Sequence, residues 1–266
     1  MRLGATENRP NWLLAGLGLL IVVATYLFLI LTGARGLVAD AEFNVPAPTS
    51  STNALIALAG YLLGAALIVV GVARQFTTST YALIPIAIAI NIAVGQIVAL
   101  SGIPIYMDSI GTVLVGVLVG PLAGAATGGL ANVIWGFFNP VAMPFAVTAI
   151  AIGLLAGLFG RLGWFRRFYL APLAGLITGI VAAIMSAPLA AFIFGGVTGA
   201  GTDALVAAFR AAGASIIEST LGQGLLSDPL DKVITFTIAY LIIIALPARM
   251  RARFSQSGAQ ADKLPR

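Results

Sequence analysis

The chain has 266 residues, of which 60% are hydrophobic and only 9% are charged. Soluble domains carry about one charged residue in four, so this composition excludes a soluble enzyme, a nucleic-acid-binding domain and a disordered scaffold. The net charge is +5, and the lack of Cys and His excludes disulfides, thiolate nucleophiles, zinc fingers and His-based metal sites. We therefore expect an all-α integral membrane protein that is not an enzyme and has no catalytic residue, metal site, cofactor or nucleic-acid partner.

Membrane-spanning helices are expected wherever about 20 apolar residues follow one another. The first such segment is too long for the apolar part of a cleavable signal peptide, so we expect an uncleaved helix. The apolar segments, in chain order, are Trp12–Thr32, Ala54–Ala73, Tyr81–Leu100, Ser109–Phe138, Met143–Gly160, Tyr169–Phe194 and Pro229–Leu246.

The segment Ser109–Phe138 decides the number of spans, because Gly120 and Pro121 lie in its middle. One kinked helix here gives seven spans, whereas two short helices joined by a Gly-Pro turn give eight. With eight spans, the side that holds both termini carries a net charge of +9 and the other side −4. Because cytoplasmic loops carry an excess of Lys and Arg, the charges favour eight spans with both termini cytoplasmic, in the cell membrane. The basic residues on that side are Arg2, Arg9, Arg74, Arg161, Arg166, Arg167, Arg249, Arg251, Arg253, Lys263 and Arg266.

The helices of this hairpin are too short to cross a bilayer in isolation. As a helix, residues 108–119 reach about 18 Å, less than the roughly 30 Å hydrocarbon core. Such a span must be shielded by protein or line a cavity, which predicts an outward-facing depression above residues 102–108 and 137–143. Glycines at a spacing of four predict close helix packing. They are Gly116, Gly120, Gly124 and Gly128, then Gly153 and Gly157, and Gly175 and Gly179.

Two longer segments outside the spans are predicted to lie on the outer side, residues 34–53 and 195–228. Within the second, we expect a short amphipathic helix capped by Asp203. Asp228 and Pro229 match an N-cap followed by the first helical position, so the last span is predicted to begin there. The expected organisation is an N-terminal two-helix extension (residues 1–79), a six-helix core (80–250) and a basic cytoplasmic tail (251–266).

A few polar and aromatic residues within the core are candidates for ligand binding, because polar residues are costly inside a membrane. Asp108 can cap a helix or contact a ligand, and the two roles are compatible. Asn132 and Trp135 share a helix face. Considered separately, Asn132 could instead form a hydrogen bond between two helices, and Trp135 could lie at the membrane–water interface. Together, a flat aromatic ring, two amides and one carboxylate suit a small polar heteroaromatic ligand. These groups belong to Trp135, Asn132, Asn139 and Asp108. The candidates are Asn91, Gln96, Tyr106, Asp108, Asn132, Trp135 and Asn139.

The same part of the chain carries several recognisable stretches, which are Asn91–Gln96, Gly102–Thr112, Gly120–Gly124, Asn132–Gly136 and Asp228–Lys232. Over residues 80–250 the chain resembles the substrate-binding S component of energy-coupling factor (ECF) transporters. The resemblance implies a six-helix membrane core that captures a water-soluble vitamin or related micronutrient from the outer face. The N-terminal helix pair is a departure, because a minimal S component lacks it.

The resemblance also implies the partners of an ABC importer, namely a transmembrane coupling subunit and two cytosolic ATPase subunits. The chain itself is expected to lie in the lipid bilayer. In the family, the first core helix presents an alanine-x-x-x-alanine face to the coupling subunit. Ala89 and Ala93 match that pattern, and Ala87 with Asn91 offers another register. The alternative function is a membrane ligand sensor or partner-binding module without transport activity.

Overall fold

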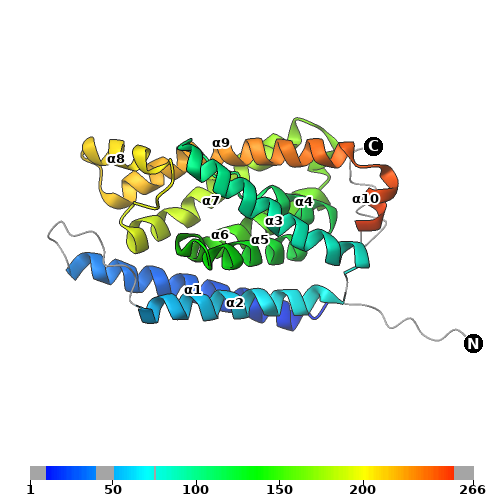
Figure 1. The fold of residues 1–266 in the computed structure, drawn as a ribbon, viewed down its shortest axis with the longest axis horizontal. Coiled ribbons are helices and arrows are strands. Elements are labelled where there is room, and N and C mark those ends of the chain that lie inside the picture. Colours follow the sequence, from blue (N-terminus) through cyan, green and yellow to red (C-terminus); the bar gives the residue numbers. More distant parts are fainter. Residues whose placement is uncertain (1–9, 40–50, 75, 255–266) are drawn as a thin grey trace, which may run out of the picture.

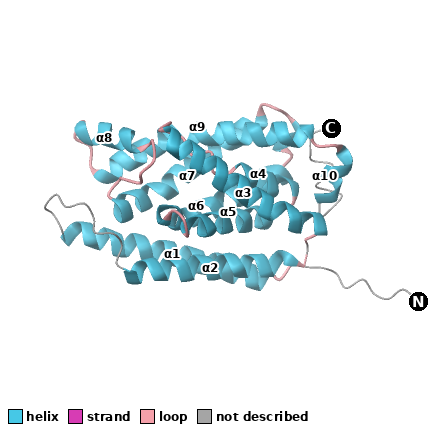
Figure 2. Ribbon diagram, viewed as in Figure 1, coloured by secondary structure: helices cyan, strands magenta, loops and turns pink. Residues whose placement is uncertain are grey.

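The structure, a computed structural model of the chain, describes residues 10–39, 51–74 and 76–254, and all regular elements within these ranges are helical (Figures 1 and 2). The longer helices lie side by side in one bundle, with α8 and α10 at opposite ends. The α-helices are α1 (Trp12–Ala39), α2 (Ser51–Ala73), α3 (Thr78–Ser101), α4 (Ile110–Leu118), α5 (Pro121–Gly136), α6 (Ala146–Arg161), α7 (Leu170–Phe194), α8 (Asp203–Ala211), α9 (Ile216–Ala245) and α10 (Ala248–Phe254). Two 3-10 helices, η1 (Pro140–Phe145) and η2 (Trp164–Arg166), precede α6 and α7.

Within the part of the chain that the structure describes, five segments are long and apolar enough to cross a membrane, as expected for a multi-pass membrane protein. They are Trp12–Gly33, Leu55–Ala73, Thr78–Ser101, Pro140–Arg161 and Leu170–Phe194. The hairpin helices α4 and α5 are shorter, with 9 and 16 residues. Helix α9 is long, but its sequence includes Glu218, Asp228, Asp231 and Lys232.

The segment 109–138 forms two helices rather than one kinked helix, which is the alternative that the charge distribution favoured. Helix α4 ends at Leu118 and α5 begins at Pro121, whose missing N–H costs nothing at the first helical position. Gly120 makes the turn with φ 140°, a backbone conformation that favours glycine. The two helices then pack closely, since a Cβ on Gly124 would lie 2.7 Å from the Cα of Gly116.

Glycines bring the other core helices equally close, which confirms the prediction from their spacing. A Cβ on Gly153 of α6 would lie 2.2 Å from the carbonyl carbon of Gly124 in α5. A Cβ on Gly175 or Gly179 of α7 would meet the backbone of α9, at Lys232 and at Pro229 respectively. The close contact between α7 and α9 places the charged part of α9 inside the bundle.

Helices α1 and α2 lie together along one side of the bundle (Figure 1) and pack on α5 and α7. The Tyr26 hydroxyl of α1 donates to the carbonyl of Met185 in α7, 3.0 Å away. Gly33 lets α1 approach the backbone of α7 at Phe192. Tyr61 of α2 is fully buried among these helices.

Several predicted boundaries differ from the structure. Helix α1 continues to Ala39 and α2 begins at Ser51, so the predicted outer loop 34–53 is wrong at both ends, and residues 40–50 lie outside the described residues. The expected tail begins as helix α10, and residues 255–266 lie outside the described part. Residues 34–39 stay helical although Gly33 lies just before this stretch and Gly36 within it, because each Gly inside a helix costs only about 1 kcal/mol.

The last long helix starts earlier than predicted. Helix α9 begins at Ile216, and Ser215 and Glu218 form a capping box at its start. Asp228 is therefore not an N-cap, and Pro229 lies inside the helix rather than at its first position. Helix α9 tolerates this proline because its neighbours pack tightly around it. The predicted outer segment 195–228 accordingly shrinks to α8 and the turns that flank it.

Candidate ligand-binding cavity

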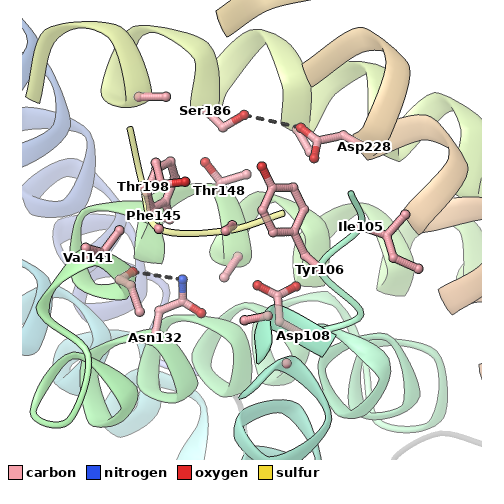
Figure 3. Close-up of a pocket in the computed structure, with 18 of the residues that line it drawn as sticks. Ile105, Tyr106, Asp108, Asn132, Val141, Phe145, Thr148, Ser186, Thr198 and Asp228 are labelled. Atoms are coloured by element: carbon pink, nitrogen blue, oxygen red, sulfur yellow. Dashed lines mark hydrogen bonds between the residues drawn. The ribbon is translucent and has the colours of Figure 1, made fainter. Parts of the chain in front are cut away.

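A cavity of about 140 Å³ opens among the core helices (Figure 3). Asp203 of α8 belongs to its wall, and α8 lies at one end of the bundle (Figure 1). At about 10–15 Å³ for each water position, the cavity has room for roughly ten waters or for one small organic molecule. Its wall is mostly apolar, with Ala, Gly, Ile, Val and Phe side chains, and a few polar groups converge on it. This combination is typical of small-molecule sites. Helices α3, α5, α6, α7, α8 and α9 all contribute to the wall, and no residue of α1 or α2 does among the residues described.

Five of the seven predicted ligand-binding residues line this cavity, which lies where the short hairpin predicted a depression. They are Tyr106, Asp108, Asn132, Trp135 and Asn139. Trp135 is only 9% exposed, and its indole N–H donates to the Gln96 side chain at 3.2 Å, so it is not an interfacial residue. Asn132 donates to the carbonyl of Ala142 at 3.1 Å and so fixes the turn that carries Asn139.

The other two predicted residues do not line the cavity. Asn91 is buried between α3 and α4, where its amide donates to the Thr112 hydroxyl at 2.8 Å and accepts from the Gly111 N–H at 2.7 Å. It joins two helices. Gln96 supports Trp135 from the outer side of α3. Neither residue is therefore placed to contact a molecule in the cavity.

A buried charged cluster connects α9 to the loop before α4. The Lys232 ammonium, 3% exposed, binds the Asp231 carboxylate, the Ser109 hydroxyl at 2.9 Å and Asp108 at 3.4 Å. Asp231 also accepts from the Met107 N–H at 2.7 Å. Asp108 is thus one partner of an ion pair rather than a helix cap, since the cap of α4 is Ser109. The cluster fixes the loop that brings Tyr106 and Asp108 to the cavity.

The Tyr106 hydroxyl is the centre of a second set of polar contacts, next to α8. The Tyr106 hydroxyl donates to Thr202 at 3.2 Å and accepts from the Gln223 amide at 3.3 Å. Burial, together with the nearby Asp228 carboxylate, raises the pKa of the Tyr106 phenol above its usual value of 10.0, so the hydroxyl keeps its proton. These bonds tie the loop after α3 to the start of α8 and to α9.

Asp203 organises the turn that covers the cavity. Its carboxylate accepts from the Thr198 N–H and hydroxyl at 3.0 and 2.9 Å, and from the Gly199 N–H at 2.7 Å. Helix α8 exists as predicted, but Thr202 rather than Asp203 occupies the N-cap position. The Asp203 side chain therefore holds the preceding turn instead of capping the helix.

Sequence reasoning missed the polar groups that α6, α7 and α9 supply. The Ser186 hydroxyl of α7 donates to Asp228 of α9 at 3.2 Å, and Thr148 of α6 also lines the cavity (Figure 3). The local pattern at Asp228 predicts a helix start, where a charged residue is common. The capping box at Ser215 instead places Asp228 and Lys232 in the interior of a long helix, where a charge marks a functional or structural site.

The predicted partner-binding residues Ala89 and Ala93 lie on the outer face of α3 and are exposed. The alternative register, Ala87 with Asn91, faces the core instead. Ala87 is buried, and a Cβ on Gly111 of α4 would lie 2.2 Å from its carbonyl oxygen. Only the first register is therefore open to another protein.

Among the residues that the structure describes, no group of three or more acidic side chains is arranged to hold a metal ion. Comparisons with protein-family models, with curated proteins and with solved structures give no match to this chain.

Proposed function

We propose that this protein is a membrane-embedded substrate-capture subunit of an ECF-type importer, which binds a vitamin or related micronutrient and performs no chemistry itself. The observation that carries the proposal is the cavity. It lies among core helices α3, α5, α6, α7 and α9, near the end of the bundle that holds α8, and combines apolar walls with a few buried polar groups. The resemblance of residues 80–250 to S components supports the same function.

The proposed membrane arrangement has eight spans, α1 to α7 and α9, with both termini in the cytoplasm. Helix α9 has 30 residues and so reaches about 45 Å, enough to cross the bilayer. The end of the bundle that holds α10 is basic, with exposed Arg74, Arg161, Arg167 and Arg249. The Thr77 hydroxyl before α3 donates to the carbonyl of Arg253 at 3.2 Å, which places these segments at one end. The positive-inside rule makes that end cytoplasmic and the cavity end external.

Because the sequence has no cysteine, single introduced cysteines report this arrangement directly. Ala212→Cys, in the turn before α9, is expected to react with a membrane-impermeant maleimide in intact cells. Ala248→Cys and Thr78→Cys are expected to react only after the membrane is opened. All three positions are exposed. Labelling of Ala212→Cys and Ala248→Cys from the same side would contradict the arrangement.

The exposed face of α3 is the proposed docking surface for the coupling subunit, because Ala89 and Ala93 leave it flat between larger apolar side chains. The helix pair α1–α2 is a proposed N-terminal extension that covers a different side, on α5 and α7. A coupling subunit on α3 would therefore not compete with it.

Ala93→Trp is expected to abolish co-purification of a coupling subunit and ATPases from the native host, because the indole holds the two proteins apart. Ala66→Trp, at an exposed alanine of α2, is the matched control and should leave the complex intact. Equal recovery of the complex with both variants would argue against this surface. Recovery of a signalling protein in place of the ATPases would favour a ligand sensor over an importer.

A further inference from the structure

Three carboxylates line the cavity, and two of them are already satisfied. Asp108 faces the Lys232 ammonium, and Asp203 accepts hydrogen bonds from three donors in the turn above it. Asp228 differs from both. It is 5% exposed, and Ser186 is its one hydrogen-bond donor among the described residues. A carboxylate held in a membrane protein with one neutral donor is poorly compensated.

Lys232 lies one turn further along α9 but forms no ion pair or hydrogen bond with Asp228 among the described residues. An ammonium has three donors, and those of Lys232 reach Asp231, Ser109 and Asp108. Asp231 and Asp108 together already outweigh its single positive charge. The formal charges of Lys232, Asp108 and Asp231 sum to −1, so the cluster has no surplus positive charge for Asp228.

A second group in the cavity is also without a partner. The Thr148 hydroxyl is buried, with 6% of the residue exposed, and forms no hydrogen bond with the described residues. Helical threonines commonly donate to the carbonyl four residues earlier, so an unpaired buried hydroxyl is unusual. Figure 3 shows Thr148, Ser186, Asp228 and the Tyr106 ring around the same space.

We infer that the ligand is a small organic cation, whose charged N–H group donates to Asp228 and to the Thr148 hydroxyl while its apolar body packs against Tyr106 and Trp135. A bound N–H group would supply both missing hydrogen bonds and the missing positive charge. The aromatic rings favour a flat or cationic group by stacking and cation–π attraction. The apolar walls and the cavity volume suit an organic molecule. This inference rests on the proposed function, because it names the class of molecule that the cavity captures.

The test uses purified full-length protein in lipid nanodiscs and probes matched in shape but not in charge. Each set carries an aminomethyl, a hydroxymethyl or a carboxylate group on one ring, as in benzylammonium, benzyl alcohol and benzoate, with pyridine, imidazole and indole analogues. Thermal-shift titrations rank their affinities. We expect at least one cation to bind at least tenfold more tightly than its neutral and anionic counterparts.

Asp228→Asn should reduce that preference for the cation at least tenfold. Glu218→Gln makes the same change at an exposed position of α9, outside the cavity, and should leave the preference intact. Thr148→Val covers the case in which Asp228→Asn does not fold, because it removes an unpaired hydroxyl without loss of volume. It should weaken binding of the cation and not lower the unfolding temperature.

Tighter binding of neutral or anionic probes would overturn the inference and leave a binding function in place. An unchanged cation preference in Asp228→Asn, or in Thr148→Val where Asp228→Asn does not fold, would also overturn it. If probes of all three charge classes fail to bind, the inference and the proposed function both fall.

Discussion

Replacement of Lys232 with Met is expected to lower the free energy of unfolding by about 3–5 kcal/mol, because it leaves buried carboxylates without a counter-charge. Lys232 is 3% exposed and Asp231 is fully buried. Met has a similar length, so the change removes the charge and little volume. Asp231 also accepts a hydrogen bond from the Met107 N–H. Met107 has φ 55°, a backbone conformation that is rare outside glycine. The loop before α4 should therefore loosen together with the loss of stability.

Two further variants show whether the loss of stability in Lys232→Met comes from the unpaired buried carboxylate or from altered side-chain packing. Adding Asp231→Asn to Lys232→Met removes the stranded carboxylate and should restore at least half of the lost stability, because a buried pair replaced as a unit costs far less than a broken one. Arg210→Met removes an exposed charge from α8 and should change stability by no more than about 0.5 kcal/mol. Unfolding in mixed detergent–SDS micelles gives all three values. Similar stabilities of Lys232→Met and Arg210→Met would contradict the buried cluster.

Gly179→Ala is expected to destabilise the protein, although it adds only a single methyl group. The new Cβ would lie 2.4 Å from the Cα of Pro229 and 2.6 Å from the carbonyl oxygen of Asp228. Backbone atoms cannot rotate away, so α7 and α9 must separate. Overpacking of this kind costs about 1–3 kcal/mol. Because Asp228 moves with its backbone, ligand binding should weaken together with stability.

Gly16→Ala is the matched control, since a Cβ on Gly16 of α1 would meet no atom within 4 Å. It should leave the unfolding temperature and ligand binding unchanged. Thermal unfolding in nanodiscs gives the unfolding temperatures of both variants under the same conditions. A Gly179→Ala protein as stable as Gly16→Ala would show that α7 and α9 do not lie as close together as the structure has them.

Local sequence patterns predicted much of the helical arrangement. The Gly-Pro pair at residues 120 and 121 indicated a kink or a hairpin, because both residues disfavour a continuous helix, and the charge distribution favoured the hairpin. The spacing of the glycines predicted which faces pack closely, as the contact between Gly124 and Gly116 shows. The short hairpin even indicated where a cavity would open, since unshielded backbone cannot face lipid.

The contacts that shape the cavity could not be predicted in this way. Lys232 and Asp108 are 124 positions apart, and nothing in the local sequence of either residue names the other. Asp228 and Pro229 look locally like a helix start, and only the capping box at Ser215 and the packing on Gly179 reveal a continuous helix. Local signals set where a helix can begin, whereas tertiary packing decides where it does.

That the cavity holds a small molecule is a claim that native mass spectrometry can test, on the protein purified from its own host. The predicted result is one small organic molecule bound to each wild-type chain and absent from Ala187→Trp, whose indole would fill the cavity. Wild-type protein that carries only lipids, or a molecule retained equally by Ala187→Trp, would contradict the claim.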